Sequence, residues 1–269
     1  MTISSFHFVR HALAATVCAC ALPAIAADAE PIATDRPDFV ESSNVVGKGR
    51  MQVESSVALE RDSRGGVRDT VWSTPTLIRF GITDNVELRV ESDGAVRQRS
   101  SAVGSAISTE RGYADASLGL KWHAMDARDS LPSVGVLLHA DLATGSRAFR
   151  DEGTRPSLRV VAEWELPNDV SFGIMPGLGY DKGNDRGEGT VFGILGVVAG
   201  KSWTDRLRSF VEVSSPRLAR ASRGGTEASL TVGSAYLITN NCQLDAALSR
   251  GLNHRTPETS LTVGLSFKL

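Results

Sequence analysis

Apolar and polar residues alternate along the chain from Arg50 to its last residue, in twelve stretches of about ten residues each. The last stretch shows the pattern most clearly: alternate positions hold Leu261, Val263, Leu265 and Phe267, and polar or small residues lie between them. Successive side chains of a β-strand point to opposite faces, so each stretch predicts a strand with one apolar face. This length suits a tilted membrane crossing better than a strand of a soluble sheet.

The predicted strands are joined by connections that alternate between short and long. We expect strands at residues 50–61, 71–80, 84–95, 111–124, 131–142, 156–166, 169–180, 190–203, 206–215, 226–238, 241–250 and 259–269. The short connections contain Asn and Asp, which favour tight hairpins. In a membrane barrel, short turns lie on the periplasmic rim and long loops on the outer rim. The sequence therefore predicts an all-β fold, a transmembrane antiparallel β-barrel of about twelve strands.

Three regions follow from this pattern: a signal peptide at residues 1–26, a periplasmic N-terminal segment at 27–49 and an outer-membrane β-barrel at 50–269. A basic start, an apolar run and the small residues before Ala27 are typical of a cleaved secretory signal. A lipoprotein signal acylated at Cys20 is the alternative. Either signal predicts export to the outer membrane of a Gram-negative cell, with outer-membrane lipid and the barrel-assembly machinery as partners.

Composition excludes several classes of function. The 269-residue chain has a formal net charge of −2, which gives no electrostatic basis for binding nucleic acid. Its 22% of charged residues is high for a helical membrane protein. The sequence contains no GxSxG motif, no phosphate-binding loop and no His/Cys cluster with metal-ligand spacing. We therefore expect a protein that is not an enzyme and has no cofactor and no metal.

The N-terminal segment carries a specific motif. Residues 34–42 read TDRPDFVES, residues 47–55 read GKGRMQVES and residues 75–89 read PTLIRFGITDNVELR. These stretches resemble the opening of proteins in the MetA-pathway of phenol degradation family. The resemblance implies an outer-membrane transporter of aromatic or other small compounds. The residues that carry it most specifically are Thr34, Asp35, Arg36, Pro37 and Asp38.

Charged residues on the polar parity of the strands are candidates for the lumen wall. They are Glu54, Arg79, Glu87, Arg89, Glu91, Lys121, His139, Asp141, Arg159 and Glu163. One interpretation is that these charges only pair with one another across strands in a narrow barrel. The other is a charged constriction that selects permeants by size and sign. His139 and Asp141 point the same way, either as a titrating pair or as hydrogen-bonded wall residues.

The segment at 27–49 is charged, stiffened by proline and precedes a charged wall. Our hypothesis is that it enters the periplasmic mouth, where its motif residues pair with charges such as Arg79, Arg89 and Glu87. A solvated tether is the alternative.

These patterns favour a channel or transporter that passes small-molecule permeants through a charged lumen. Three other functions stay open. A secreted or outer-membrane β-barrel with a binding or structural role would share the alternation of residues. An outer-membrane lipid hydrolase would need His and Ser together on the lipid-facing surface, and no strand face supplies that pair. A receptor or adhesin would act through the outer loops.

Overall fold

The computed structural model describes residues 30–102, 104–182 and 189–269, and the predicted signal peptide lies outside these residues. The strands are β1 (Met51–Asp62), β2 (Val67–Ser73), β3 (Thr76–Gly81), β4 (Val86–Ser92), β5 (Ala95–Ala102), β6 (Ser108–Tyr113), β7 (Ala116–Met125), β8 (Ser133–Leu142), β9 (Arg155–Leu166), β10 (Val170–Asp181), β11 (Thr190–Thr204), β12 (Leu207–Leu218), β13 (Glu227–Thr239), β14 (Cys242–Gly251) and β15 (Thr259–Lys268). Two single-turn 3₁₀ helices, η1 (Arg64–Gly66) and η2 (Ala221–Arg223), lie in loops.

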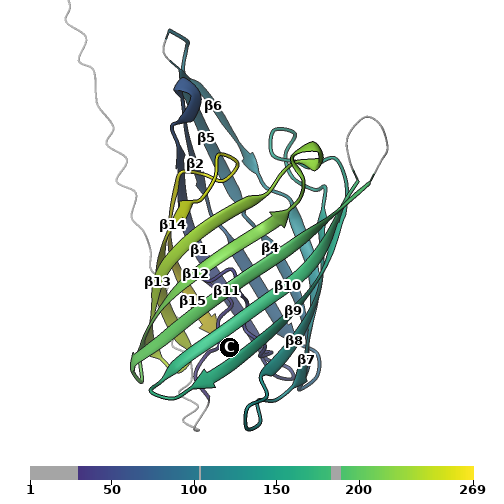
Figure 1. The fold of residues 1–269 in the computed structure, drawn as a ribbon, viewed down its shortest axis with the longest axis vertical. Coiled ribbons are helices and arrows are strands. Elements are labelled where there is room, and N and C mark those ends of the chain that lie inside the picture. Colours follow the sequence, from purple (N-terminus) through teal and green to yellow (C-terminus); the bar gives the residue numbers. More distant parts are fainter. Residues whose placement is uncertain (1–29, 103, 183–188) are drawn as a thin grey trace, which may run out of the picture.

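The strands form one closed antiparallel barrel (Figure 1). Each barrel strand pairs with its neighbour in sequence, and β1 closes the cylinder by pairing with β15 from Gln52–Lys268 to Arg61–Thr259. Three barrel strands are each made of two pieces, namely β2 with β3, β4 with β5, and β6 with β7. The fifteen strands of the described chain therefore make twelve barrel strands, which confirms the fold predicted from alternation.

One predicted loop is wrong. Residues 96–110 were expected to form a long outer loop, but most of them continue the sheet as β5 and β6. Together with β2 these strands extend the wall beyond the rest of the outer rim (Figure 1). The alternation of apolar and polar residues fails here because the extension lies above the apolar belt, where no face of the sheet has to be apolar. We call β2, β5 and β6 the extension.

The connections lie as predicted. The turns at 82–85, 167–169, 205–206 and 240–241 are short, and the remaining short-rim connection spans 126–132. The N-terminal segment reaches this same rim, because the Ile32 amide donates to the Asn240 carbonyl at 2.7 Å. The last residue lies there too, with the Leu269 amide donating to the Met51 carbonyl at 2.7 Å.

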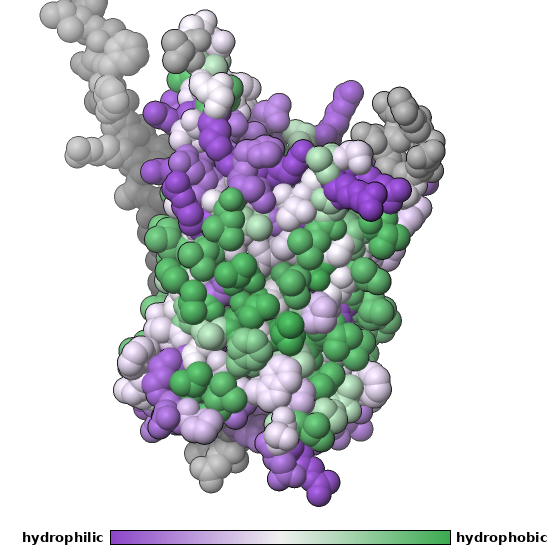
Figure 2. All heavy atoms as spheres, in the orientation of Figure 1, coloured by the Kyte–Doolittle hydropathy of each residue, from purple (hydrophilic) through white to green (hydrophobic). Residues whose placement is uncertain are grey.

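Figure 2 shows an apolar belt across one face of the barrel, and exposed large hydrophobic residues of the other strands continue it around the barrel. Its members are large hydrophobic residues on the outward parity of every barrel strand, such as Val57, Leu120, Leu178 and Val263. Trp122 and Trp203 project outward near the short-turn rim, as expected for aromatic residues at a membrane boundary. Apolar side chains facing outward around a closed barrel define a protein that resides in lipid. In the described ranges no helix is long and apolar enough to cross a bilayer.

The interior of the barrel is mainly polar, but it contains one apolar cluster and separate buried apolar side chains such as Leu77 and Phe210. Leu137, Val161 and Met175, from β8, β9 and β10, point inward and pack against Val40 of the N-terminal segment. Glu54, Arg79 and many other inward residues are charged or polar and are also buried. The interior is therefore filled by side chains from the wall and by the N-terminal segment together.

Candidate functional site

Residues 30–49, which we call the lumen segment, run through the inner half of the barrel. The segment enters beside Asn240, passes across the lumen and returns to the short-turn rim at Gly47 and Gly49. The Gly49 amide donates to the Gly81 carbonyl at 2.8 Å, and the chain then continues into β1. At Gly81 the Gly47 carbonyl oxygen lies 1.7 Å from where a Cβ would stand, so only glycine fits there.

Four carboxylates of the barrel wall bind backbone amides of the lumen segment. Glu54 of β1 accepts from Asp35 and Arg36, both at 2.9 Å. Glu212 of β12 accepts from Phe39 at 2.9 Å and from Val40 at 2.7 Å. The third and fourth are Glu163, which accepts from Ser43 at 2.6 Å, and Glu87, which accepts from Val46 at 2.9 Å. Hydrogen bonds to a charged acceptor are stronger than neutral ones, so these contacts fix the path of the segment.

Cations of the wall bind carbonyl groups of the same segment. Arg79 donates to Ala33 at 2.8 Å and to Asn44 at 2.7 Å. Lys121 donates to the Ser42 carbonyl at 2.7 Å. The segment forms no strand or helix of its own, and the wall supplies the hydrogen bonds that regular structure would have provided.

A buried network of charges joins the segment to β3, β4 and β7. Asp35 lies 2.5 Å from Arg89, 2.7 Å from Lys121 and 3.4 Å from Arg79. Arg79 also pairs with Glu87 at 2.8 Å and with Glu54 at 3.1 Å. All of these side chains are at most 2% exposed, and each charge has at least one opposite partner, as buried charges require.

Glu41 extends this network toward β9. It lies 2.6 Å from Arg89 and 3.1 Å from Arg159. Further along, Arg36 pairs with Glu91 at 2.8 Å, and Asp38 pairs with Arg208 of β12 at 3.3 Å. Charged residues of the segment therefore contact several sides of the wall.

Two carboxyls of the lumen segment have opposite pKa shifts. Burial by itself would raise the pKa of Asp35, but Arg79, Lys121 and Arg89 outweigh burial and hold the pKa well below its usual range. Burial raises the pKa of Asp38, and the single cation Arg208 offsets this only in part. Asp35 is therefore held as an anion, whereas Asp38 binds a proton more readily than a free aspartate does.

The apolar tip of the segment fits against glycine in the wall. A Cβ at Gly196 of β11 would lie 2.5 Å from Val40 and 2.9 Å from Phe39. A Cβ at Gly173 of β10 would lie 2.9 Å from Val198 and 3.3 Å from Val40. Because Gly173 and Gly196 have no side chain, the wall has space for Phe39 and Val40 at the tip of the segment.

The lumen segment divides the interior into cavities. The outer cavity, of about 610 Å³, is lined by the tip residues Asp35, Arg36, Asp38 and Glu41. The inner cavity, of about 490 Å³, is lined by residues of both legs of the segment, including Ala33 and Val46. A third cavity of about 160 Å³, here the side cavity, lies between the segment and β10, β12 and β14.

The side cavity shares lining residues with both of the others. It shares Asp38 with the outer cavity and Ala33 with the inner cavity. Its wall includes Ser171, Arg208 and Gln243. The three cavities therefore lie next to one another, with the side cavity on the side of the barrel away from Arg79 and Lys121.

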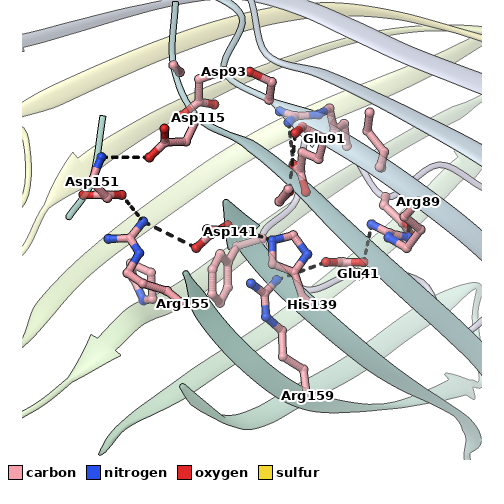
Figure 3. Close-up of a pocket in the computed structure, with 18 of the residues that line it drawn as sticks. Glu41, Arg89, Glu91, Asp93, Asp115, His139, Asp141, Asp151, Arg155 and Arg159 are labelled. Atoms are coloured by element: carbon pink, nitrogen blue, oxygen red, sulfur yellow. Dashed lines mark hydrogen bonds and ion pairs between the residues drawn. The ribbon is translucent and has the colours of Figure 1, made fainter. Parts of the chain in front are cut away.

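The outer cavity has more acidic than basic residues (Figure 3). Its acidic lining residues are Asp35, Asp38, Glu41, Glu60, Glu91, Asp93, Asp115, Asp141 and Asp151, and its arginines are Arg36, Arg89, Arg155 and Arg159. Arg155 bridges Asp151 at 2.6 Å and Asp141 at 3.4 Å. His139 contacts Asp141 at 3.0 Å, so the two residues that alternation placed on one face are hydrogen-bonded.

The structure brings most of the sequence candidates into one site. Glu54, Arg79, Glu87, Arg89 and Lys121 form the buried network around Asp35. The outer cavity is lined by Glu91, His139, Asp141 and Arg159. Glu163 binds the segment and lines the side cavity. In the motif, Thr34 accepts a hydrogen bond from Gln243 at 2.8 Å, and the Arg36–Pro37 peptide bond is cis.

Some residues of the site were not among the sequence candidates. Glu41 of the segment binds Arg89 and Arg159 of the wall, but a single carboxylate in a loop has no distinctive signal in the sequence. Leu137, Val161 and Met175 were also missed. A signal for these three did exist, because each is followed or preceded by another apolar residue and so breaks the alternation.

In the described residues, His, Cys, Asp and Glu form no group that could hold a metal ion. His123 contacts the Ser43 carbonyl at 3.0 Å and Asp126 at 2.8 Å, and His139 contacts Asp141. Both histidines therefore serve the interior of the barrel rather than a lipid-facing Ser–His pair.

The closed barrel, the apolar belt and the charged interior define an outer-membrane β-barrel. Residues 34–269 match the model of the family described as "Putative MetA-pathway of phenol degradation", and the chain belongs to that family. No curated protein matches the chain in sequence.

Solved structures show the same fold. The COG4313 outer membrane channel from Pseudomonas putida F1 is similar with a TM-score of 0.60 and 13% identity, over 87% of this chain and 99% of that one. The translocator domain of the autotransporter NalP from Neisseria meningitidis is similar with a TM-score of 0.51 and 17% identity, over 82% of this chain and 88% of that one. At these identities the likeness concerns the fold.

Proposed function

We propose that the protein is an outer-membrane channel for small polar solutes, in which the lumen segment leaves open a narrow passage through the side cavity. The observation that carries the proposal is the series of three neighbouring polar cavities, in which Asp38 lines the outer and side cavities and Ala33 lines the side and inner cavities. Membership of the family and the likeness in fold to the COG4313 outer membrane channel support the same proposal.

The excess of carboxylates in the outer cavity sets the selectivity. Solutes that enter from outside first meet Glu60, Asp93 and Asp115, none of which is ion-paired in the described chain. Rings of acidic side chains attract cations and repel anions. We therefore propose a channel that prefers cations and neutral polar solutes, including small phenols, over anions.

The passage is tested by filling the side cavity. Ser171→Phe places a ring in this cavity, and it should lower the conductance of the reconstituted protein in planar bilayers several-fold, since the side cavity is only about 160 Å³. Ser249→Phe is the matched control, because it adds the same ring to β14 away from that cavity. Equal conductance of Ser171→Phe and wild type would refute this route.

Selectivity is tested separately. The reversal potential in a KCl gradient should show cation preference, and liposome swelling should be faster with uncharged phenols and sugars than with aromatic acids. If the protein passes no ions and none of these solutes, the channel is refuted and a binding or structural role is favoured.

A further inference from the structure

We propose that the outward face of the extension binds the phosphate groups of a phosphorylated lipid in the outer leaflet of the membrane. The face is built from Arg61 at the end of β1 and from Arg68, Arg97, Arg99 and Arg111 on β2, β5 and β6. All five side chains are exposed. The register places them on the same side as Trp72 and Leu59.

Charge is sorted between the two faces of this sheet. Leu59, Trp72, Arg97 and Arg111 form one row across the four strands, and Arg61, Thr70, Arg99 and Thr109 form the next. The carboxylates of the same described strands have the opposite parity and point inward. They are Glu54, Glu60, Asp62, Asp69 and Glu110.

The arginines lack internal partners. Among the described residues, none of the five forms a hydrogen bond or ion pair through its guanidinium. Arg97 lies directly opposite Arg111 on the neighbouring strand. Like charges in that position destabilise a sheet, so an anion from outside the chain would relieve the repulsion. Guanidinium groups bind phosphate with two parallel hydrogen bonds, which makes phosphate the matching anion.

The position of the arginines points to a lipid. Directly beneath Arg97 and Arg111 lies a groove of about 570 Å³ that is also lined by Val57, Trp72, Ala95 and Tyr113. Val57, Trp72 and Tyr113 are 51%, 46% and 69% exposed, so the groove opens outward to the membrane. Figure 2 shows hydrophilic residues gathered directly above the apolar belt at the height of β2 and β5.

An apolar groove capped by two arginines matches a lipid that has an acyl chain and a phosphorylated headgroup. Tryptophan and tyrosine favour the membrane–water boundary, and headgroup phosphates lie at the same level. A solute phosphate would use the arginines but leave the groove empty. We therefore assign the site to a phosphorylated glycolipid of the outer leaflet, with its phosphate between Arg97 and Arg111.

Binding of bisphosphorylated lipid A to the purified full-length protein in detergent, followed by native mass spectrometry, tests the site. Arg97→Gln/Arg111→Gln should weaken binding at least about tenfold, because two charge-assisted contacts are lost. Arg147→Gln/Arg150→Gln removes the same charge from another outer loop and should bind like wild type. Dephosphorylated lipid should bind weakly to all three proteins.

Several results would overturn the assignment. They are equal binding by Arg97→Gln/Arg111→Gln and wild type, equal binding of dephosphorylated lipid, and full competition by millimolar inorganic phosphate, which would identify a free-anion site. The heat-dependent gel shift of a closed barrel checks that each variant is folded. If the first variant does not fold, the single variants Arg97→Gln and Arg111→Gln each remove one contact, and unchanged binding by both would then refute the proposal.

Discussion

The ammonium group of Lys121 lies 2.7 Å from the carboxylate of Asp35, a residue 86 positions earlier in the chain. Both side chains are almost completely buried, at 0% and 2% exposure. This pair attaches the lumen segment to β7 on one side, while Arg89 attaches the same carboxylate to β4. Asp35 therefore ties the lumen segment to two strands of the wall.

Replacing Asp35 should release the lumen segment. Asp35→Asn removes the anion and leaves Lys121 and Arg89 with fewer opposite charges, and breaking a buried pair costs about 3–5 kcal/mol. We expect a larger single-channel conductance in planar bilayers, approaching that of a variant lacking residues 30–45. Asp205→Asn, in an exposed turn, is the control. Wild-type conductance in Asp35→Asn would contradict this prediction.

The pH dependence of the segment follows from the lowered pKa of Asp35. A carboxyl whose pKa is lowered in the bound state stabilises that state above its ordinary pKa of 3.8, and the contribution is lost as the pH falls below this value. The raised pKa of Asp38 has the opposite sign, because its protonation favours the bound state. The segment should therefore stay bound from about pH 8 to 5 and loosen only below about pH 4.

The measurement is the ratio of wild-type conductance to that of the variant lacking residues 30–45, taken across this range of pH. The ratio removes the direct effect of pH on the wall charges. Asp35→Asn should lack the change below about pH 4. A transition between pH 5 and 8 would show that another group controls the segment.

Glu212 should control the tip of the segment without affecting its start. Glu212→Gln removes the charge that accepts the amides of Phe39 and Val40, so these amides should exchange with deuterium on the order of tenfold faster. The amides of Asp35 and Arg36 bind Glu54 and should exchange at the wild-type rate. Equal acceleration at both places would show that the segment moves as one unit.

Gly196 should tolerate no larger side chain while the tip is in place. In Gly196→Val the new side chain would collide with Val40 and Phe39, and overpacking of this kind costs about 1–3 kcal/mol. We expect faster proteolysis within residues 30–49. Gly193→Ala, on the same strand but next to Leu218, should leave the digestion rate unchanged. Gly196→Val is also introduced into the variant that lacks residues 30–45. If it destabilises that variant as much as it destabilises the full-length protein, the new side chain does not collide with the segment.

Much of the site could be predicted from the sequence, because the charged residues of the lumen occupy the inward-facing positions of the strands. Once Phe80 and Leu88 are assigned to lipid, Arg79 and Arg89 have to face inward. The partners of these residues could not be foreseen. Arg79 and Arg89 are themselves opposite each other on neighbouring strands, and the acids that neutralise them come from the segment and from other positions.

The amino-acid sequence by itself determined the barrel, its twelve strands and its topology, but not the extension formed by β2, β5 and β6. The alternation of apolar and polar residues is a local property. In each pair of neighbouring strand residues, one side chain faces lipid and the other faces the polar interior. Only the tertiary structure decided the path of the lumen segment. Its backbone amides and carbonyls are held by wall residues up to 238 positions away, and every residue except proline offers the same amide. The tertiary structure also decided which carboxylates stay unpaired in the outer cavity, because pairing depends on the curvature that closes β1 onto β15.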